Sequence, residues 1–369
     1  MAYRDKKGQI EVTFNWVYIL IAGAVILLFF FGLVFKQKAV SEQNLGNDLV
    51  RIMDSIFTGA GVSEKTKNFI DLSGLADYTL YFDCVDGVGE YGLKGTSARV
   101  ENEVDPLFAP REIKGTQLIV WSLPYKLPYK VIDFLFVTSS NTKYFLFGGN
   151  TGVFDVESFM NSTEGFKRDY VTSEQYKSID PGKNFQVRLV DLSGDIIGKG
   201  KEVPEKLQAM DNNKVTAVVF RGSNQVDYYQ KEGERWTKLN YNTPVQIVSL
   251  GGERDAAKYA AIFAADDKVY KCNMQKAFKR LKYINEVYSG KAEEMKIFYS
   301  SKTFSKECFG YIQEGKPNLI DALSSQANLL QGCFKDNTLS NCGKLIESAM
   351  EIKTVNDNLG EKGDCITLY

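Results

Sequence analysis

The most apolar part of the chain is an unbroken run of twenty residues, 16–35, that contains no charged residue and no proline. A helix of this length crosses the roughly 30 Å hydrocarbon core of a bilayer. No other run of this kind occurs in the sequence. We therefore predict a single transmembrane helix over 16–35, preceded by a basic flank, 1–15, and followed by a large body.

Apolar residues continue beyond this run at close to helical spacing, which predicts an amphipathic stem helix over 36–60. They are Val40, Leu45, Leu49, Ile52, Met53, Ile56 and Phe57. Gly46 is the position where the long helix would most readily break, and Gly59 and Gly61 are expected stop signals. The apolar stripe of the stem must pack either on the body of the same chain or on the stems of neighbouring copies.

Residues 61–266 are rich in β-branched and aromatic runs, and they predict a mixed α/β ectodomain. Two runs, 131–137 and 215–220, are almost continuously apolar, which is typical of strands buried on both faces. Weakly helical patterns are expected at 155–179 and 202–211. The strands are expected at 78–84, 96–101, 116–121, 131–138, 143–147, 185–192, 214–221, 225–231, 244–250 and 258–264.

The pattern changes to helical periodicity from 267, and residues 267–369 are predicted to form a helical subdomain that contains five of the six cysteines. The first helix has an apolar stripe of Met274, Phe278, Leu281, Ile284 and Tyr288. Its basic residues, Lys276, Lys279, Arg280 and Lys282, suggest a solvated face or, alternatively, a contact with an acidic lipid or polymer. Further helices are expected from Pro317, which suits a first helical turn, and over 342–355.

Charge and histidine content narrow the classes of function. The 369 residues include 45 Lys and Arg against 46 Asp and Glu, so the net charge of −1 argues against a nucleic-acid partner. Histidine is absent from the sequence. Ser–His and Cys–His catalysis, His-ligated metal sites and a histidine pH switch are therefore excluded. We nominate no catalytic, cofactor-binding or metal-binding residue and expect no cofactor.

The cysteines all follow the apolar run, are even in number and form no C-x-x-C pair, which favours disulfides in an extracytoplasmic body. Six cysteines allow fifteen pairings. The spacing favours Cys333–Cys342, then Cys272–Cys308, with Cys84–Cys365 tying the tail to the body. The alternative is a cytosolic body in which all six are reduced, buried thiols.

The flanking charges agree with an extracytoplasmic body. Arg4, Lys6 and Lys7 precede the apolar run, whereas Lys36 and Lys38 follow it, so the positive-inside rule places the N-terminus in the cytoplasm. Asn161-Ser162-Thr163 is a glycosylation sequon, with Asn161 as the acceptor, and permits an outside location.

Lys6-Lys7-Gly8-Gln9, just ahead of the apolar helix, resembles the class III signal of archaeal type IV pilins and archaellins. That resemblance implies cleavage between Gly8 and Gln9, after which the apolar helix remains as an assembly stem. The fifth mature residue would be Thr13, where many pilins have glutamate. The alternative is an uncleaved signal anchor. The chain as a whole resembles uncharacterised archaeal proteins with a single membrane anchor, which implies no activity.

Four short motifs have spacings found in catalytic, ligand-binding or partner-binding sites. Residues 87–92 match G-x-G-x-x-G, but a poor helix former follows, so a glycine-rich hairpin is expected rather than a nucleotide site. Ser140 and Lys143 have the S-x-x-K spacing without its companion motifs, which favours a hairpin turn. The pairs Asp83/Asp86 and Asp266/Asp267 offer oxygen ligands for a cation, although helix capping explains Asp266. The repeat 123–130, L-P-Y-K twice, predicts an extended connector between strands or, less simply, a partner-binding strap.

These observations together predict a membrane-anchored surface protein that acts by protein–protein interaction or assembly, as in a pilin-like or cell-envelope complex. Its expected partners are the lipid bilayer, other membrane or surface proteins, and a second copy through the stem helix. The rival hypothesis is a membrane-tethered extracytoplasmic hydrolase or transferase that uses carboxylates scattered in the sequence.

Overall fold

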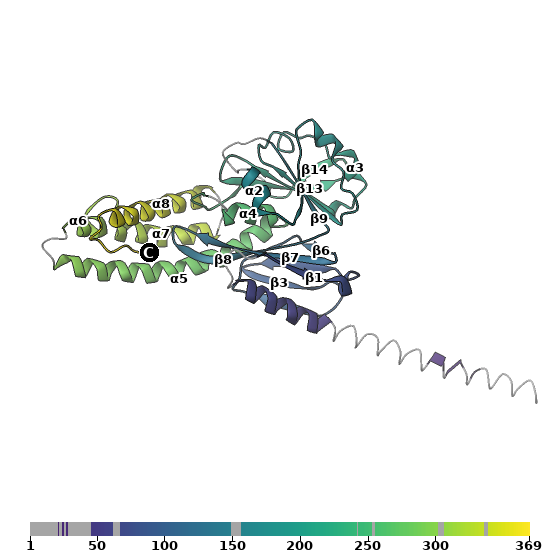
Figure 1. Ribbon diagram of the computed structural model, residues 1–369, viewed down its shortest axis with the longest axis horizontal. Helices are drawn as coiled ribbons and strands as arrows, with labels where there is room; N and C mark the ends of the chain where they lie inside the picture. Colours follow the sequence, from purple (N-terminus) through teal and green to yellow (C-terminus); the bar gives the residue numbers. More distant parts are fainter. Residues whose placement is uncertain are drawn as a thin grey trace, which may run out of the picture.

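Three β-sheets and a bundle of long helices make up the folded body (Figure 1). The computed structural model describes residues 21, 24–25, 27–28, 46–61, 67–148, 156–241, 243–252, 255–301, 306–335 and 339–369. The architecture is mixed α+β with disulfides, in agreement with the coarse prediction. The flank 1–15, the leader residues Gly8 and Gln9, most of 16–35 and the first part of the stem lie outside the described residues.

Sheets A and B form the lower half of the body in Figure 1. Sheet A has the order β1 (Lys67–Asp71), β7 (Gln117–Lys126), β8 (Lys130–Ser139) and β5 (Leu107–Phe108). Sheet B has the order β4 (Arg99–Asn102), β3 (Val88–Leu93), β2 (Leu80–Val85) and β6 (Glu112–Ile113). The long β7–β8 hairpin is antiparallel and forms the centre of sheet A.

Sheet C lies above them and contains the parallel part of the fold. Its order is β10 (Lys167–Tyr170), β9 (Thr142–Phe147), β11 (Gln186–Asp191), β12 (Val215–Phe220), β13 (Gln225–Glu232) and β14 (Arg235–Lys238), with β15 (Val245–Gln246) on β13. The first four of these strands are parallel neighbours, and the others are antiparallel. Val215–Phe220 is buried as the apolar run predicted.

Helices cover the sheets and form the C-terminal bundle at the left of Figure 1. The short ones are η1 (Ser73–Leu75), α2 (Val156–Ser162), η2 (Gln175–Ser178), α3 (Glu205–Gln208), η3 (Asn212–Lys214), α4 (Ala256–Phe263), α6 (Lys306–Phe309) and η5 (Gly310–Glu314). The long ones are α5 (Asp267–Ser300), α7 (Leu319–Lys335) and α8 (Leu339–Glu361). α5 runs from the sheets into the bundle, so it connects the two parts (Figure 1).

Three hydrophobic cores hold these layers together. The largest joins sheet A, one face of sheet C, α4 and the C-terminal helices. A second lies between the other face of sheet A, sheet B and the helix over 46–61. The third fills the other face of sheet C beneath η2 and α3. Each face of sheet A and of sheet C is therefore buried against a different neighbour.

The described part of the predicted stem, 46–61, is one helix that packs on its own body rather than projecting from it. Leu49, Val50, Met53 and Phe57 are buried in the second core, whereas Ile52 is 57% exposed on the opposite side. The Phe57 ring meets that of Tyr91 edge-on at 5.0 Å between centroids.

Gly46, the expected break, is helical. A Cβ at this position would lie 3.2 Å from that of Ala98, so the missing side chain lets the helix approach sheet B closely. Gly59, one expected stop signal, is helical, and Gly61, the other, is the last described residue of this helix.

Three predicted elements were wrong in type or extent. The expected strand 258–264 is α4, which is buried on every side and is capped by Asp255, whose side chain accepts a hydrogen bond from the Ala257 N–H. A short run that is apolar except for Lys258 has no clear period that separates a buried strand from a buried helix. Of 155–179, only α2 is α-helical, and β10 follows it. Of 244–250, only Val245–Gln246 pairs as a strand.

In the described part of the chain, no helix combines the length and apolar character that crossing a bilayer requires. The described residues of the 16–35 run are helical, and Ile21, Val25, Leu27 and Leu28 are each more than half exposed.

Candidate functional site

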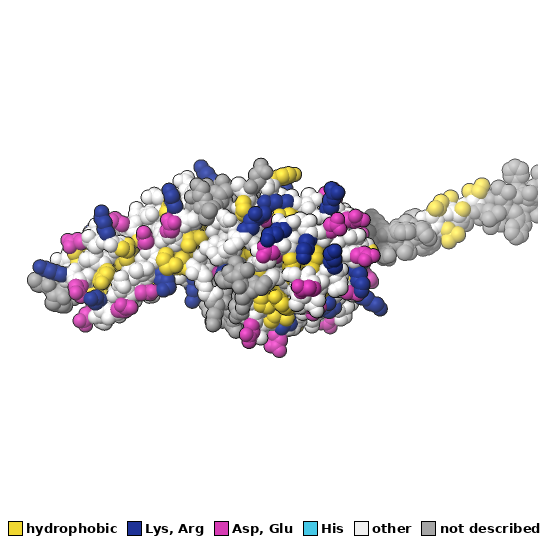
Figure 2. Space-filling view, turned by 90° about the horizontal axis from the view of Figure 1, so that it is seen from above, with side chains coloured by type: hydrophobic (Ala, Val, Ile, Leu, Met, Phe, Trp, Pro, Cys, Tyr) yellow, Lys and Arg dark blue, Asp and Glu magenta, His cyan; other side chains and the backbone are white. Residues whose placement is uncertain are grey.

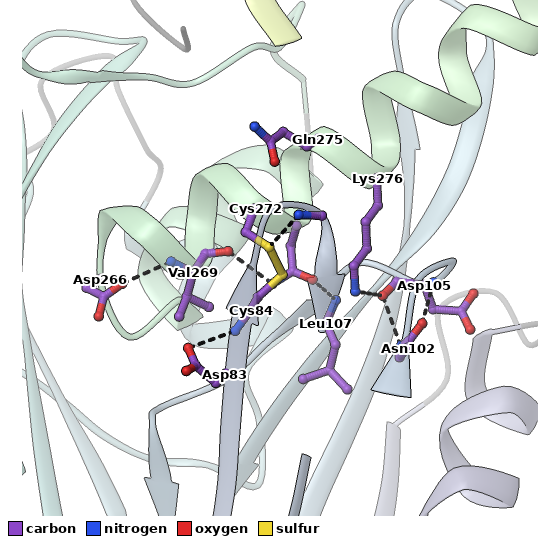
Figure 3. Close-up of a disulfide and its surroundings, with 12 residues drawn as sticks. Asp83, Cys84, Asn102, Asp105, Leu107, Asp266, Val269, Cys272, Gln275 and Lys276 are labelled. Carbon is purple, nitrogen blue, oxygen red and sulfur yellow. Dashed lines mark hydrogen bonds between the residues drawn. A yellow bond between two sulfur atoms is a disulfide. The ribbon is translucent and has the colours of Figure 1, made fainter. Parts of the chain in front are cut away.

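Sheet B meets α5 at a covalent joint, where several polar side chains surround a disulfide (Figure 3). Cys84 at the end of β2 is disulfide-bonded to Cys272 in the second turn of α5, and each is 4% exposed. The backbone N–H of Gly87 lies 3.2 Å from the Cys272 Sγ atom. The bond therefore fixes the β2–β3 hairpin to a helix 188 residues later in the sequence.

The aspartates nominated for a cation do meet here, but around an arginine. Arg111 lies between Asp83, 2.5 Å from its NH1 atom, and Asp266, 2.7 Å from its NH2 atom. Asp266 also caps α5 by accepting a hydrogen bond from the Val269 N–H at 2.9 Å. Within the described residues, no group of three metal-binding side chains converges. The guanidinium of Arg111 thus lies between two aspartates that the sequence suggested as ligands of a cation.

The other two aspartates of the nominated pairs lie apart from this ion pair. Asp86 has a positive φ of 51° in the β2–β3 turn. Asp267 pairs instead with Lys271 of its own helix, at 3.3 Å. Only one member of each pair therefore reaches Arg111.

Lys276, expected on a solvated face, is instead 4% exposed at the same joint. Burial lowers the pKa of its ammonium group to about 8, although the carboxyl groups of Asp105 and Glu103 oppose this shift. Its Nζ atom donates to the backbone carbonyl oxygen of Asp105 at 3.2 Å (Figure 3). Burial also raises the pKa of Asp105, against the opposing effect of Lys276. A perturbed lysine is a candidate nucleophile, but one this deeply buried cannot reach a dissolved substrate in this conformation.

The loop that receives Lys276 is held by two asparagines, of which Figure 3 labels Asn102. The Asn102 side chain accepts from the backbone N–H groups of Val104 and Asp105. The Asn273 side chain accepts from the Leu107 N–H at 3.0 Å. Because each polar group faces a protein partner, the joint has the character of a structural clamp.

The glycine-rich motif begins in a turn and continues along β3, and the S-x-x-K spacing begins in a turn and ends in β9. The expected hairpin is confirmed: Asp86 and Gly87, at φ of 51° and 82°, connect β2 to β3. Ser140 and Asn141 form a turn between β8 and β9, but these strands belong to sheets A and C, so the predicted hairpin is wrong there. Lys143 pairs with Asp169 at 2.7 Å.

The L-P-Y-K repeat is the end of the β7–β8 hairpin, as its interpretation as a connector between strands predicted. Leu127 and Tyr129 are buried rather than free to bind a partner. The Tyr129 hydroxyl donates to Gln326 Oε1 at 2.8 Å, and Asn285 donates to the same oxygen at 2.7 Å. The hairpin end therefore docks between α5 and α7 of the same chain.

All six cysteines form disulfides, and two of the three predicted pairings were wrong. Cys333–Cys342 pairs as expected. Cys272 bonds to Cys84 instead of Cys308, and Cys365 bonds to Cys308 instead of Cys84. Sequence proximity favoured Cys272–Cys308, which left Cys84 for Cys365, but α5 places Cys272 beside sheet B while Cys308 lies beyond its far end. Asn161, the expected glycosylation acceptor, is exposed at the end of α2.

A separate cavity of about 100 Å³ lies between sheet C, Arg111 and the α4–α5 connection. Its most buried charge is Arg188, which donates to four carbonyl oxygens at the C-terminal end of α4, including that of Ala264 at 2.7 Å. Burial lowers the pKa of this guanidinium, opposed mainly by Tyr228 and Tyr144. The carbonyls at a helix C-terminus stabilise a cation there.

The sequence did not point to Arg111, Arg188, Asp105 or Gln186 as residues of a site. The only available signal was a charged or amide residue within a strongly apolar strand, as Arg188 stands between Val187 and Leu189. That signal marks a buried polar group but not its partner.

Comparison with models of protein families, with curated proteins and with solved structures finds no match to this chain.

Proposed function

We propose that this chain is a single-pass membrane protein that holds its folded body on the extracytoplasmic side and acts through protein–protein contacts. The observation that carries the proposal is the succession of two segments: an apolar run over 16–35, and a helix over 46–61 whose inner face is buried on the body. A run that inserts in a bilayer would thereby hold the body close to the membrane surface.

Two further observations support this location. Ile21, Val25, Leu27 and Leu28 of the run are 59–72% exposed, as lipid-facing side chains would be. The disulfides suit an oxidising compartment. The class III signal remains part of the proposal: cleavage after Gly8 would leave the run as an assembly stem, and an uncleaved signal anchor is the alternative.

The contact surface that we propose is the outer face of α5, because the inner face of the 46–61 helix is already buried. Tyr283, Val287 and Ile297 lie on one side of α5 and are 54%, 70% and 69% exposed. In contrast, the face of the body seen in Figure 2 intersperses positive and negative side chains with small apolar groups. A stripe of exposed apolar side chains is typical of a contact site.

The rival hydrolase or transferase hypothesis needs carboxylates that converge. Asp105 and Asp255 have pKa values raised by burial, but their partners differ. Asp105 lies beside Lys276, whereas Asp255 caps α4 and accepts from Ser249 Oγ at 2.6 Å. We therefore favour the contact protein.

The test of location is labelling of intact cells with a membrane-impermeant amine reagent, followed by mass spectrometry of the membrane fraction without reduction. We expect labelled surface lysines such as Lys206, which is exposed, and three disulfide-linked peptide pairs. The same spectra give the N-terminal residue, Met1 or Gln9. Unlabelled lysines together with free thiols would reject the extracytoplasmic body.

The test of the contact surface replaces Val287 and Ile297 by arginine and compares chemical crosslinking in intact membranes. Loss of the crosslinked species supports the proposal. A matched control replaces Val85 and Val104 by arginine, since these valines are 61% and 64% exposed and lie outside α5. Equal crosslinking of all three proteins would reject α5 as the contact.

A further inference from the structure

A groove lies between α5 and α7 on the C-terminal bundle, and it has a volume of about 430 Å³. Phe278 of α5 and Leu330 of α7 are buried in its lining, and the 40% exposed ring of Phe334 lines the same groove. Two exposed lysines of α5, Lys279 and Lys282, line it as well. The groove therefore combines an apolar surface with two ammonium groups.

Side-chain hydrogen bonds join the two helices on either side of this groove. The Gln275 amide donates to the backbone carbonyl oxygen of Phe334 at 3.2 Å. The Asn285 amide donates to Gln326 Oε1 at 2.7 Å. The two positions of α5 are separated by about 15 Å along the helix axis. Because its walls are fixed before binding, the groove loses little conformational entropy when a partner docks.

The positive charge beside the groove is not balanced by nearby carboxylates of the described part of the chain. Residues 268–285 contain six Lys and Arg residues and no Asp or Glu. Among the described residues, neither Lys279 nor Lys282 forms an ion pair. The one carboxylate of α7 is that of Asp321, which accepts a hydrogen bond from Asn318 at the start of that helix. A partner that carries carboxylates would therefore complement the groove.

The outer face of α8 carries the complementary pattern. Met350 is 46% exposed there, and the exposed Glu347 and Glu351 lie within one helical turn of it. Residues 345–352 contain no Lys or Arg, and neither glutamate forms an ion pair with another described residue. Side chains three or four positions apart on a helix are about 5–6 Å apart at Cβ. The two glutamates therefore have nearly the spacing of the two lysines in the groove.

We propose that the groove receives the outer face of α8 from a second copy of this chain, with Met350 in the groove and its two neighbouring glutamates paired with Lys279 and Lys282. Since α7 lies between α5 and α8 (Figure 1), the contact joins two different surfaces and is heterologous. The net charge of −1 leaves little overall repulsion between copies. This inference rests on the contact role of α5 proposed above, and it names the partner.

The test measures self-association of the full chain in a nonionic detergent by sedimentation equilibrium. Lys279→Glu/Lys282→Glu and Glu347→Lys/Glu351→Lys should each raise the dissociation constant at least roughly tenfold, because like charges then face each other. The chain that carries all four substitutions should regain the affinity of the unmodified protein, since its charges are complementary again.

A zero-length carbodiimide crosslinker identifies the residues in contact. In a mixture of isotopically light and heavy chains, it should join Lys279 or Lys282 of one copy to Glu347 or Glu351 of another. The matched control is Lys177→Glu/Lys183→Glu, which makes the same change in net charge at two exposed lysines outside the bundle. This control should associate as the unmodified chain does.

Equal association of all these chains would overturn the proposal. Weakening by the two lysine substitutions that the four substitutions together do not reverse would also overturn it, because α8 would then not be the occupant of the groove. Failure of the broader contact role gives a different result, since Val287→Arg/Ile297→Arg would then leave crosslinking in membranes unchanged. If that pair abolishes crosslinking there while the charge variants associate normally, α5 is a contact site and a second copy is not its partner.

Discussion

The ammonium nitrogen of Lys276 lies 3.2 Å from the backbone carbonyl oxygen of Asp105, next to the disulfide that joins Cys84 to Cys272. One helix thus holds sheet B by a covalent bond and the adjoining loop by a buried cation. The cation is costly there, since burial disfavours the charged form of an amine.

The lowered pKa of Lys276 predicts a pH dependence of stability. Between pH 8 and 10.5, the unfolded chain binds more protons at this residue than the folded chain does, so its contribution to folding becomes more favourable as pH rises. Lys276→Met removes this dependence. We expect the variant to have the larger free energy of unfolding at pH 7. The gain should be about 1.4 kcal/mol for each pH unit by which folding lowers the pKa of Lys276.

The measurement is urea denaturation of both proteins at several pH values. The difference in unfolding free energy between them should shrink as pH rises from 8 to 10.5. Comparing the two proteins cancels the titration of tyrosines such as Tyr91, whose pKa burial raises. A difference that stays constant over this window would contradict the assignment.

The docked helix over 46–61 gives a prediction that separates its two faces. Phe57→Ala should lower the free energy of unfolding by about 3–5 kcal/mol, because a buried aromatic side chain leaves a cavity. Ile52→Ala on the exposed face of the same helix should change it by at most about 0.5 kcal/mol. Thermal or urea unfolding measures both. Equal effects would mean that the helix does not pack on the body in solution.

The sequence predicted well where periodicity and length agree. The apolar stripe from Met274 indicated a helix, and α5 begins at Asp267 as expected. The nearly continuous run 215–220 is β12, buried as predicted. These elements follow from local patterns that need no knowledge of the rest of the fold.

The sequence did not predict those features of the fold that depend on long-range packing. The run 258–264 is apolar except for Lys258, so its pattern does not distinguish a strand from the helix that Asp255 caps between two sheets. Cys84 and Cys272 are 188 residues apart, and proximity in sequence therefore misled the pairing. Lys276 was expected on a solvated face, since a lysine close to other basic residues of a helix carries no sign of the loop that covers it.

Removal of the two disulfides of most different span should have unequal effects. In the chain-entropy model, closing the loop between Cys84 and Cys272 is worth roughly 5 kcal/mol, and closing that between Cys333 and Cys342 roughly 3 kcal/mol. We expect the Cys84→Ala/Cys272→Ala variant to unfold at the lower urea concentration. A larger loss from Cys333→Ala/Cys342→Ala would show that strain or residual structure outweighs loop length.

Arg188 should matter through the helix end that it caps. Arg188→Met leaves the carbonyls of Ala261, Ile262, Ala264 and Ala265 without their buried donor. We expect a loss of roughly 2–4 kcal/mol in unfolding free energy, since orphaned buried acceptors cost about 1–3 kcal/mol each and some relax. Arg188→Lys should lose less, because the ammonium keeps the charge and part of the hydrogen bonding.

The matched control is Arg168→Met, because the Arg168 guanidinium also donates to backbone carbonyls, those of Met160 and Phe166, but is only half-buried. Water can replace the Arg168 guanidinium there, so the loss in unfolding free energy should stay below about 1 kcal/mol. Hydrogen exchange adds a local readout. The backbone amides of α4 should exchange faster in Arg188→Met, and their exchange rates should be unchanged in the control. Unaltered exchange in α4 would show that Arg188 does not hold this helix end, because the lost hydrogen bonds all lie there.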